Sequence, residues 1–325
     1  MARDSVGQAS PSGILLVDKP AGWTSHDVVA RVRRLAGTRK VGHAGTLDPM
    51  ATGLLVAGIG SCTRLLTYVV GVDKEYTATV RLGASTSTDD AEGERLRTAP
   101  AERVLAVAPS DIETAIARLT GEIQQIPSAV SAIKVDGKRA YARIRAGEDV
   151  HLAARAVTVS AFELLGSCLV QPDSTVGADA GVIWRDLTVR VECSSGTYVR
   201  ALARDLGDAL GVGGHLTALR RTRVGPFTVA KAAALESMVV AERLLSPAAA
   251  ASALCEVFAL TAQQAVDLGH GKRIEVAADV PDSHGRPVAA IAPDGTLVGI
   301  VEFQSDTVAR KARVLVNFPP EPSAR

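Results

Sequence analysis

The spacing of apolar residues along the chain predicts short strands interspersed with helices. Residues 76–82 carry an apolar side chain at every second position, which is typical of a half-buried strand. Thr24 and Asp27 have the spacing of a capping box, and the apolar residues behind them share one face, so a helix is predicted to end near Gly37. Similar patterns predict strands at 13–18, 54–60, 157–165 and 182–193. A second helix is predicted at 112–119, with Ser110 and Glu113 as its capping pair, and a third is predicted to begin at Thr197.

These elements do not alternate as they would in a parallel α/β protein, so the predicted class is α+β with a mixed, mainly antiparallel sheet. Residues 230–253 are rich in alanine and are predicted to be helical. After Glu256, strand patterns at 296–302 and 313–318 predict a small β-rich module. We therefore expect three parts: a flexible tail at 1–12, a main domain at 13–253 and a C-terminal module at 254–325.

Composition places the chain among globular proteins. Of its 325 residues, 47% are hydrophobic and 22% are charged, which suffices for a packed core. No apolar run reaches the roughly 20 residues that span a bilayer, and the polar N-terminus lacks the order of a signal peptide. The four cysteines contain no C-x-x-C pair, so neither a metal site nor a disulfide framework is expected. These features predict a cytoplasmic protein without membrane contact.

Local charge is the first property that favours a nucleic-acid partner. The net charge is only +1, but phosphate binding needs a basic face rather than a basic chain. A single basic run is usually a solvated surface, whereas several runs beside unusual loops favour an interface. Three such runs occur, and they are Arg31, Arg33, Arg34, Arg39 and Lys40; Lys134, Lys138, Arg139, Arg143 and Arg145; and Arg220, Arg221 and Arg223.

Residues 41–53 are the most informative segment, a predicted loop rich in glycine and threonine between two apolar elements. Its three glycines permit positive φ angles or close backbone approach. Asp48 precedes a proline, which disfavours helix there, so the loop presents one carboxylate beside His43, Thr46 and Thr52. An ordinary Asp-Pro pair usually caps a turn. On residue types alone, both a turn cap and a reactive carboxylate are open interpretations.

Several other reaction classes lack their residues. Aspartyl-phosphate chemistry needs a second acid two residues after the aspartate for magnesium, and Met50 stands there. The G-x-S-x-G motif of serine hydrolases and the phosphate-binding G-x-x-x-x-G-K-[ST] motif do not occur. A two-carboxylate glycosidase would need a partner acid that the loop does not supply. The reaction class that remains uses a single carboxylate as nucleophile, without a metal ion.

Four motifs occur in an order that is specific for one family. They are Lys19-Pro20 with Gly22 and Thr24-Ser25, GHAGTLDPMATG at 42–53, IPSAVSAIKVDGKRAY at 126–141, and SSGTYVRALARDLG at 194–207. Together they resemble the TruB family of tRNA pseudouridine synthases over about 13–227, with the spacing of the bacterial members. The resemblance implies a pseudouridine synthase core with a central RNA-binding cleft. Beyond Glu256 the chain resembles, more weakly, a PUA-type RNA-binding module.

The resemblance also implies the residues of the site. Asp48 matches the catalytic aspartate, Arg200 matches the arginine that pairs with it, and Tyr76 matches the aromatic residue that stacks on the target base. No cofactor and no metal are implied, because the isomerisation transfers no electrons. The implied substrate-binding residues are Tyr198 and Leu219 at the uracil, His43 at the displaced nucleotide, and Lys19 and Lys134 in loop support and phosphate contact.

The implied reaction converts uridine 55 in the T loop of tRNA to pseudouridine. The base must be flipped out of the loop, while basic residues hold the stem phosphates. Two first steps suit Asp48: attack on the ribose C1′ and removal of a ribose proton. We expect a monomer that acts on the T stem-loop without an obligatory protein partner. Two alternatives stay open, an RNA-folding factor without chemistry and a synthase for another RNA, although the joint presence of Asp48, Tyr76 and Arg200 argues against the first.

Overall fold

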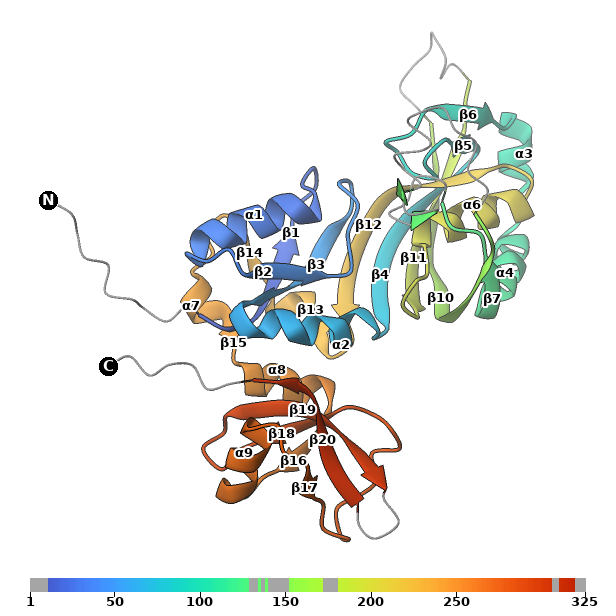
Figure 1. Cartoon of the computed structure of the whole chain (residues 1–325). Coiled ribbons are helices and arrows are strands. Elements are labelled where there is room, and N and C mark those ends of the chain that lie inside the picture. Colours follow the sequence, from blue (N-terminus) through green and yellow to red (C-terminus); the bar gives the residue numbers. More distant parts are fainter. Residues whose placement is uncertain are drawn as a thin grey trace, which may run out of the picture.

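A large mixed sheet forms the framework of the protein (Figure 1). The computed structural model describes residues 11–128, 152–171, 181–305 and 310–318, and the backbone of two short paired strands, β8 (Lys134–Val135) and β9 (Lys138–Arg139). The large sheet contains β1 (Gly13–Lys19), β2 (Val41–Ala44), β3 (Thr52–Ile59), β4 (Lys74–Leu82), β7 (Gly121–Gln125), β10 (Arg155–Val170), β11 (Trp184–Cys193), β12 (Gly214–Val224), β13 (Phe227–Thr228), β14 (Ala233–Ala234) and β15 (Leu244–Leu245).

The strand order confirms the predicted sheet type. The main path is β14-β1-β3-β12-β4-β11-β10-β7, with β2 beside β3, β13 beside β12 and β15 beside β1. Only the pairs β1–β14 and β3–β12 are parallel, and the other described pairs of this sheet are antiparallel. The sheet is therefore mixed and mainly antiparallel, as expected for an α+β protein.

Helices lie along both halves of this sheet. A short hairpin of β5 (Ala84–Thr86) and β6 (Arg95–Thr98) extends from the half that carries α6. The helices of the main domain are α1 (Ser25–Leu35), α2 (Leu66–Val70), α3 (Ala101–Ala106), α4 (Pro109–Arg118), α6 (Val199–Ala209), α7 (Val240–Arg243) and α8 (Pro247–Leu254), with 3-10 turns η1 (Gly60–Leu65) and η2 (Val229–Lys231).

The two halves of the sheet meet at β12. This strand pairs with β4 over most of its length, but with β3 only where Arg220 and Arg221 lie opposite Thr52 and Gly53. The approach requires glycine at position 53, because its φ is +97° and a Cβ atom there would lie 2.3 Å from the carbonyl oxygen of Arg221. Figure 1 shows the segment between β2 and β3 at this junction.

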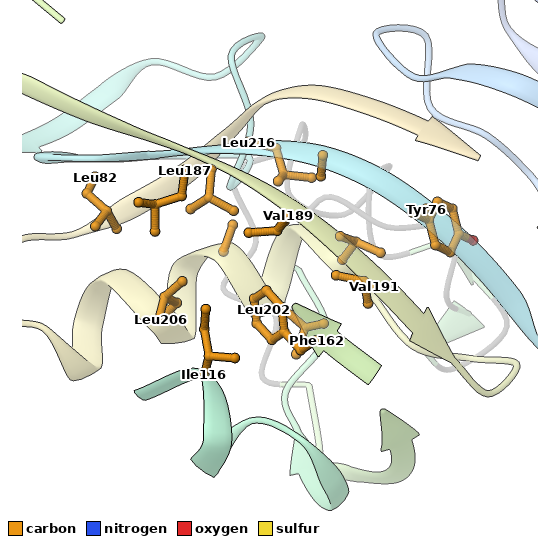
Figure 2. Packing of buried hydrophobic residues seen from close by; sticks show 14 of the residues in the cluster. Tyr76, Leu82, Ile116, Phe162, Leu187, Val189, Val191, Leu202, Leu206 and Leu216 are labelled. Carbon is orange, nitrogen blue, oxygen red and sulfur yellow. The ribbon is translucent and has the colours of Figure 1, made fainter. Parts of the chain in front are cut away.

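Each half has its own apolar core. In one half, α1 packs on β1 and β3 through Val28, Val32 and Leu55. In the other, α4 and α6 cover one face of β4, β10 and β11. Figure 2 shows Leu206 and Ile116 below Leu187 of the sheet, with Tyr76 at the end of the cluster. The alternating apolar residues of 76–82 therefore form a buried face, as predicted.

The C-terminal module contains a second, five-stranded sheet. Its strands are β16 (Glu256–Ala259), β17 (Ile274–Glu275), β18 (Val288–Ile291), β19 (Leu297–Ser305) and β20 (Arg310–Asn317), and its helix is α9 (Ala262–Gly269). This confirms a β-rich module, while its likeness to a PUA domain and the boundary at 253/254 stay predictions. The module and the main domain share one apolar cluster that includes Ile14, Leu54, Ala250, Ala289 and Ile300.

Three local predictions were wrong. The alanine-rich stretch 230–253 is only partly helical, because α7 and α8 are separated by β15, which pairs with β1. Residues 41–44 of the predicted loop form β2. The helix predicted at 112–119 begins earlier, at Pro109, and Asp111 rather than Glu113 accepts the hydrogen bond from the backbone N–H of Ala108. Among the helices of the described residues, none is long and apolar enough to cross a membrane.

Candidate active site

A pocket of about 280 Å³ opens at the junction of the two half-sheets. Five of the residues predicted from the sequence line it together: Asp48, Tyr76, Tyr198, Arg200 and Leu219. They come from four separate segments, namely the β2–β3 loop, β4, the start of α6 and β12. The remaining lining residues are Gly45, Thr46, Leu47, Val70, Lys74, Ser195, Gly196, Thr197, Val199 and Arg221.

The β2–β3 loop that carries Asp48 is fixed by hydrogen bonds to its backbone. Arg221 donates from Nη2 to the carbonyl oxygen of Gly45 at 2.9 Å. The hydroxyl of Ser25 accepts from the N–H of Leu47 at 2.9 Å and lies 3.1 Å from the carbonyl oxygen of Leu47. The N–H of Gly22 donates to the carbonyl oxygen of Pro49 at 2.9 Å. The residues on both sides of Asp48 are thus held in place, which orients its side chain.

Lys19 supports the same loop from inside. Its side chain is 0% exposed, and its ammonium group donates to the carbonyl oxygens of Pro20, Trp23 and Pro49 at 3.0, 2.6 and 3.2 Å. Burial lowers the pKa of Lys19 to about 8, against the opposing influence of Asp48. This position suits the predicted role in loop support. A phosphate contact does not fit, because all three donors of the ammonium group already point at carbonyl oxygens.

Arg200 connects Asp48 to a second buried carboxylate. Its Nε lies 3.0 Å from Oδ2 of Asp48, and its Nη1 lies 3.3 Å from Oδ2 of Asp90 and 2.8 Å from the carbonyl oxygen of Thr88. The arginine side chain is 5% exposed. Asp90 is fixed in turn, because its carboxylate accepts from the hydroxyl of Thr88 and from the N–H of Glu92. The guanidinium is therefore held from one side and presents Nε to Asp48.

The environment of Asp48 opposes its ionisation overall. The side chain is 38% exposed, yet burial of the carboxyl is the largest influence and raises its pKa above the ordinary range of aspartate. Arg200 acts against this shift, Asp90 adds to it through like-charge repulsion, and Lys19 again acts against it. Burial thus disfavours the ionised carboxylate while Arg200 favours it, and a poorly solvated carboxylate beside a fixed arginine suits a nucleophile or a base.

Tyr76 and Leu219 supply the apolar walls of the pocket. They lie on the neighbouring strands β4 and β12 and are 8% and 7% exposed. Burial raises the pKa of the Tyr76 hydroxyl, and Arg221 beside it opposes the shift. The hydroxyl is therefore protonated at neutral pH, and the ring offers a flat surface on which a base can stack.

Tyr198 is positioned by a residue that the sequence did not reveal. Gln125, buried at the end of β7, accepts from the N–H of Tyr198 at 2.8 Å and donates to its carbonyl oxygen at 3.1 Å. Tyr198 is the residue before the first turn of α6, two positions ahead of Arg200. Gln125 therefore fixes the N-terminal end of α6, the helix that carries Arg200.

Lys74 was also missed, although it lines the pocket. Its ammonium group donates to the carbonyl oxygens of Val70 and Val72 at 2.7 and 2.6 Å, and burial lowers its pKa. Ser195 donates its hydroxyl to the carbonyl oxygen of Val70 at 2.8 Å. The end of α2, the start of β4 and the loop before α6 are thereby joined at the rim of the pocket.

Besides Lys19, two further predicted substrate-binding residues are not placed at the pocket. His43 lies on β2, its ring meets that of His26 edge to face at 5.8 Å, and it is not among the described residues that line the pocket. Burial lowers the pKa of His43, followed by the influence of His26, so the ring is neutral near pH 7. The side chain of Lys134 lies outside the described residues.

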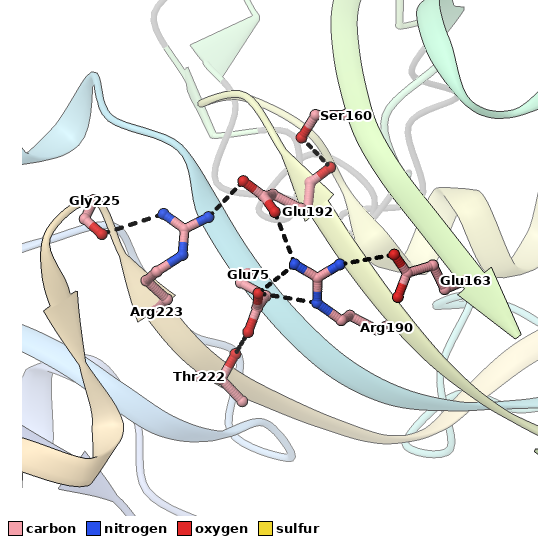
Figure 3. A network of polar contacts seen from close by, with 8 residues as sticks. All are labelled: Glu75, Ser160, Glu163, Arg190, Glu192, Thr222, Arg223 and Gly225. Carbon is pink, nitrogen blue, oxygen red and sulfur yellow. Dashed lines mark hydrogen bonds and ion pairs between the residues drawn. The ribbon is translucent and has the colours of Figure 1, made fainter. Parts of the chain in front are cut away.

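The third basic run is not a free cationic surface. Arg221 is buried and donates to the carbonyl oxygens of Leu54 and Gly45, and Arg220 pairs with Asp18 at 2.7 Å. Arg223 pairs with Glu192 at 2.7 Å in a cross-strand network that Figure 3 shows. These arginines hold strands together, and a contact between this run and phosphates stays a prediction.

The first basic run, on α1 and before β2, does present exposed charge. Arg33 is exposed but donates from Nη2 to the carbonyl oxygen of Val41 at 3.1 Å, which ties the end of α1 to the start of β2. Arg34, Arg39 and Lys40 are exposed as well. This run therefore keeps its predicted place as a candidate for phosphate contact.

Comparisons with known proteins cover nearly the whole chain. Residues 33–199 match the TruB family pseudouridylate synthase (N terminal domain), residues 200–259 the tRNA pseudouridylate synthase B C-terminal domain, and residues 256–319 the tRNA Pseudouridine synthase II, C terminal. The tRNA pseudouridine synthase B of Leifsonia xyli is 63% identical over 95% of this chain and 97% of that protein. The protein of that name from Arthrobacter sp. is 56% identical over 89% and 92%.

Solved structures share the fold at lower sequence identity. A Cbf5-Nop10-Gar1 complex contains a chain with a TM-score of 0.67 and 24% identity, covering 94% of this chain and 85% of that chain. An H/ACA RNP bound to a substrate RNA gives the same TM-score at 23% identity, with 96% and 88% covered. The sequence matches, which span both the segment that carries Asp48 and the C-terminal module, show that the chain belongs to the TruB family of tRNA pseudouridine synthases.

Proposed function

We propose that the chain converts uridine 55 in the T loop of tRNA to pseudouridine, with Asp48 as the catalytic carboxylate. The observation that carries the proposal is the geometry at Asp48. A carboxylate held by a buried arginine faces a pocket whose walls are the Tyr76 ring and the Leu219 side chain. A flat base can enter between such walls only after it has left its stack.

The reaction exchanges one glycosidic bond for another. The bond between N1 and the ribose C1′ breaks, the uracil turns, a bond forms between C5 and C1′, and C5 loses its proton while N1 gains one. Asp48 can attack C1′, forming an ester that C5 later displaces, or it can begin by removing a ribose proton. In either case Arg200 keeps the carboxylate ionised and aimed, and covalent or electrostatic help at the sugar divides a difficult step into easier ones.

Tyr76 is the residue best placed to act on the base. Its ring lies in the wall of the pocket, and its hydroxyl is protonated near neutral pH because burial raises its pKa. We propose that the ring stacks on the uracil and that the hydroxyl takes part in the transfer of the C5 proton. Tyr198 and Leu219 would hold the edge and the other face of the base.

The remaining proposals concern the partner and the setting. We propose that the protein acts as a monomer without an obligatory protein partner. The substrate would be the T stem-loop of tRNA in the cytoplasm, and the module at 254–325 would provide further RNA contact.

Position mapping tests the target directly. An unmodified tRNA transcript is incubated with the enzyme, and pseudouridine is located by reverse transcription after carbodiimide treatment. One new stop immediately 3′ of position 55 is expected, with none in a matched transcript that carries cytidine at position 55. Modification confined to another position, or equal modification of other RNAs of similar length, would refute the proposed substrate.

A further inference from the structure

Helix α6 presents two arginines to one loop. Arg200 and Arg204 are four residues apart and so lie on the same face of the helix, one turn from each other. Arg200 contacts the carbonyl oxygen of Thr88 and the carboxylate of Asp90. Nη1 of Arg204 lies 3.2 Å from Oδ2 of Asp89. Three consecutive residues of the β5–β6 loop thus meet the same helix face.

The backbone at Asp89 makes this arrangement possible. Its φ is +58°, in the left-handed region that few residues other than glycine adopt and that aspartate and asparagine tolerate best. In an extended chain, neighbouring side chains would point to opposite sides. The left-handed turn instead lets the carboxylates of Asp89 and Asp90 both face α6. The carbonyl oxygen of Asp89 is fixed as well, because it accepts from the N–H of Leu216 on β12 at 3.0 Å.

Arg204 also connects a third segment. Its Nη2 donates to the carbonyl oxygen of Ile126 at 2.8 Å, one residue after the Gln125 that brackets Tyr198. Asp205 binds the same guanidinium, with Oδ1 at 2.9 Å from Nε, but lies on α6 itself rather than on the loop. Asp89 and Asp205 therefore share one arginine, and of these two carboxylates only that of Asp89 belongs to the loop whose Thr88 and Asp90 hold Arg200.

We propose that the Asp89–Arg204 ion pair is a positioning device for the reaction, and this rests on the function proposed above. The pair fixes the loop on α6, so that Thr88 and Asp90 hold Arg200 in the orientation that aligns Asp48. Without the pair, the loop can pivot and the Arg200 guanidinium loses its alignment. Misplacement of a reacting group by a fraction of an ångström lowers the rate strongly, whereas tRNA binding is spread over a much larger surface.

Steady-state kinetics of tritium release from tRNA labelled at uridine C5 tests the device. Asp89→Asn keeps the shape and the tolerance for positive φ but loses the charge. We expect kcat to fall about tenfold with KM unchanged. The kcat of Arg204→Met should fall by a similar factor. The kcat of the double variant should be no lower than that of the slower single variant, because the two side chains act as a unit. Asp205→Asn is the matched control and should stay within about twofold of wild type.

A second variant separates the ion pair from the backbone strain. In Asp89→Gly, the glycine adopts positive φ freely but has no carboxylate. This variant should therefore fold well, and its kcat should fall as much as that of Asp89→Asn. Wild-type kcat in Asp89→Asn or Asp89→Gly, or an equal loss in Asp205→Asn, would overturn the inference. A wild-type protein that releases no tritium would refute the proposed function instead, so the two failures are distinguishable.

Discussion

At the scale of single residues, the site depends on one guanidinium shared between two carboxylates. Arg200 contacts Asp48 through Nε and Asp90 through Nη1. Asp90 therefore has two opposing effects on Asp48: it fixes the arginine that orients Asp48, and its negative charge makes Asp48 harder to ionise.

The pH dependence of the rate should reveal this balance. Because the folded pKa of Asp48 is raised, activity should be lost on acidification at a pH above the ordinary aspartate pKa of about 4. Asp90→Asn removes a charge that raises this pKa, so the acid limb of kcat should move to lower pH. The plateau of kcat should fall at the same time, because Arg200 loses an anchor. A pH–rate profile from about pH 5 to about pH 8 measures both effects.

A neighbouring acid provides the control for this profile. Glu94 is exposed on the same loop and is not among the largest influences on the pKa of Asp48. Glu94→Gln should leave both the acid limb and the plateau of the kcat profile unchanged. If the acid limb of the kcat profile did not move in Asp90→Asn, the result would contradict the charge interaction between Asp90 and Asp48.

The sequence predicted the residues that line the pocket better than the residues that hold them in place. Asp48 and Arg200 lie in distinctive motifs and Tyr76 matches a family position on a strand with a clear period, and the structure gathers all three in one pocket. Asp90 and Gln125 gave no such signal. Their roles arise from contacts with residues far along the chain, as between Gln125 and Tyr198, and only folding brings those together.

At the scale of elements, strand β12 helps to fix the loop that carries Asp48. Arg221 reaches from this strand to the carbonyl oxygens of Leu54 and Gly45, one at each end of the loop. Its neighbour Arg220 points elsewhere and pairs with Asp18, and the side chains of that pair are 41% and 32% exposed. Two adjacent arginines of the same strand thus differ in their structural roles.

Arg221→Met should therefore destabilise the protein and slow the reaction. The substitution removes a donor from two buried carbonyl oxygens, which should lower the free energy of unfolding by about 2–4 kcal/mol. It also frees the end of the loop at Gly45, so kcat should fall. Chemical denaturation and single-turnover rates measure the two effects.

Arg220→Met is the matched control on the same strand. It removes an exposed ion pair, which should change the free energy of unfolding by less than about 1 kcal/mol. Equal destabilisation by the two substitutions would show that burial of the guanidinium does not decide its contribution.

Patterns with a clear period predicted elements well, and composition alone did not. The half-buried strand at 76–82 and the α1 helix behind its capping box were found as predicted. The stretch 230–253 is rich in alanine, yet pairing of β15 with β1 divides it. Tertiary contact overrides helix propensity there, since propensity differences between most residues are below about 1 kcal/mol each.

At the scale of the whole molecule, exposed cations lie close together beside α1. Within the described part of the chain, Arg34, Arg39 and Lys40 are exposed and make no ion pair, unlike Arg220 and Arg223. Helix α1 begins at Ser25, which contacts the residue before Asp48, and extends roughly 15 Å from there. A duplex stem could therefore cross this surface while one base occupies the pocket.

Neutralising this surface should weaken RNA binding in a salt-dependent way. The triple variant Arg34→Ala, Arg39→Ala, Lys40→Ala should bind tRNA more weakly. The slope of log K against log salt should become shallower by about 0.9 for each phosphate that the protein no longer neutralises. The rate at saturating tRNA should not change, because the pocket is untouched. Filter binding at several salt concentrations measures the slope.

A second surface that carries two arginines is the control. Arg103 and Arg118 line a groove beside α3 and α4, away from β2 and α1. Their replacement by alanine should leave both affinity and slope unchanged. If both sets of substitutions weakened tRNA binding equally, the surface beside α1 would not be the one that binds the RNA.

The catalytic role of Asp48 is tested by comparing wild type with Asp48→Asn in tritium release from C5-labelled tRNA. Wild type should release tritium in proportion to the target uridine. Asp48→Asn should release none, while it binds tRNA normally and unfolds at a temperature no lower than wild type, because the raised pKa means that ionised Asp48 does not stabilise the fold. Release by Asp48→Asn at the wild-type rate would contradict the assignment of the catalytic residue, and the absence of release from folded, tRNA-binding wild type would contradict the proposed reaction.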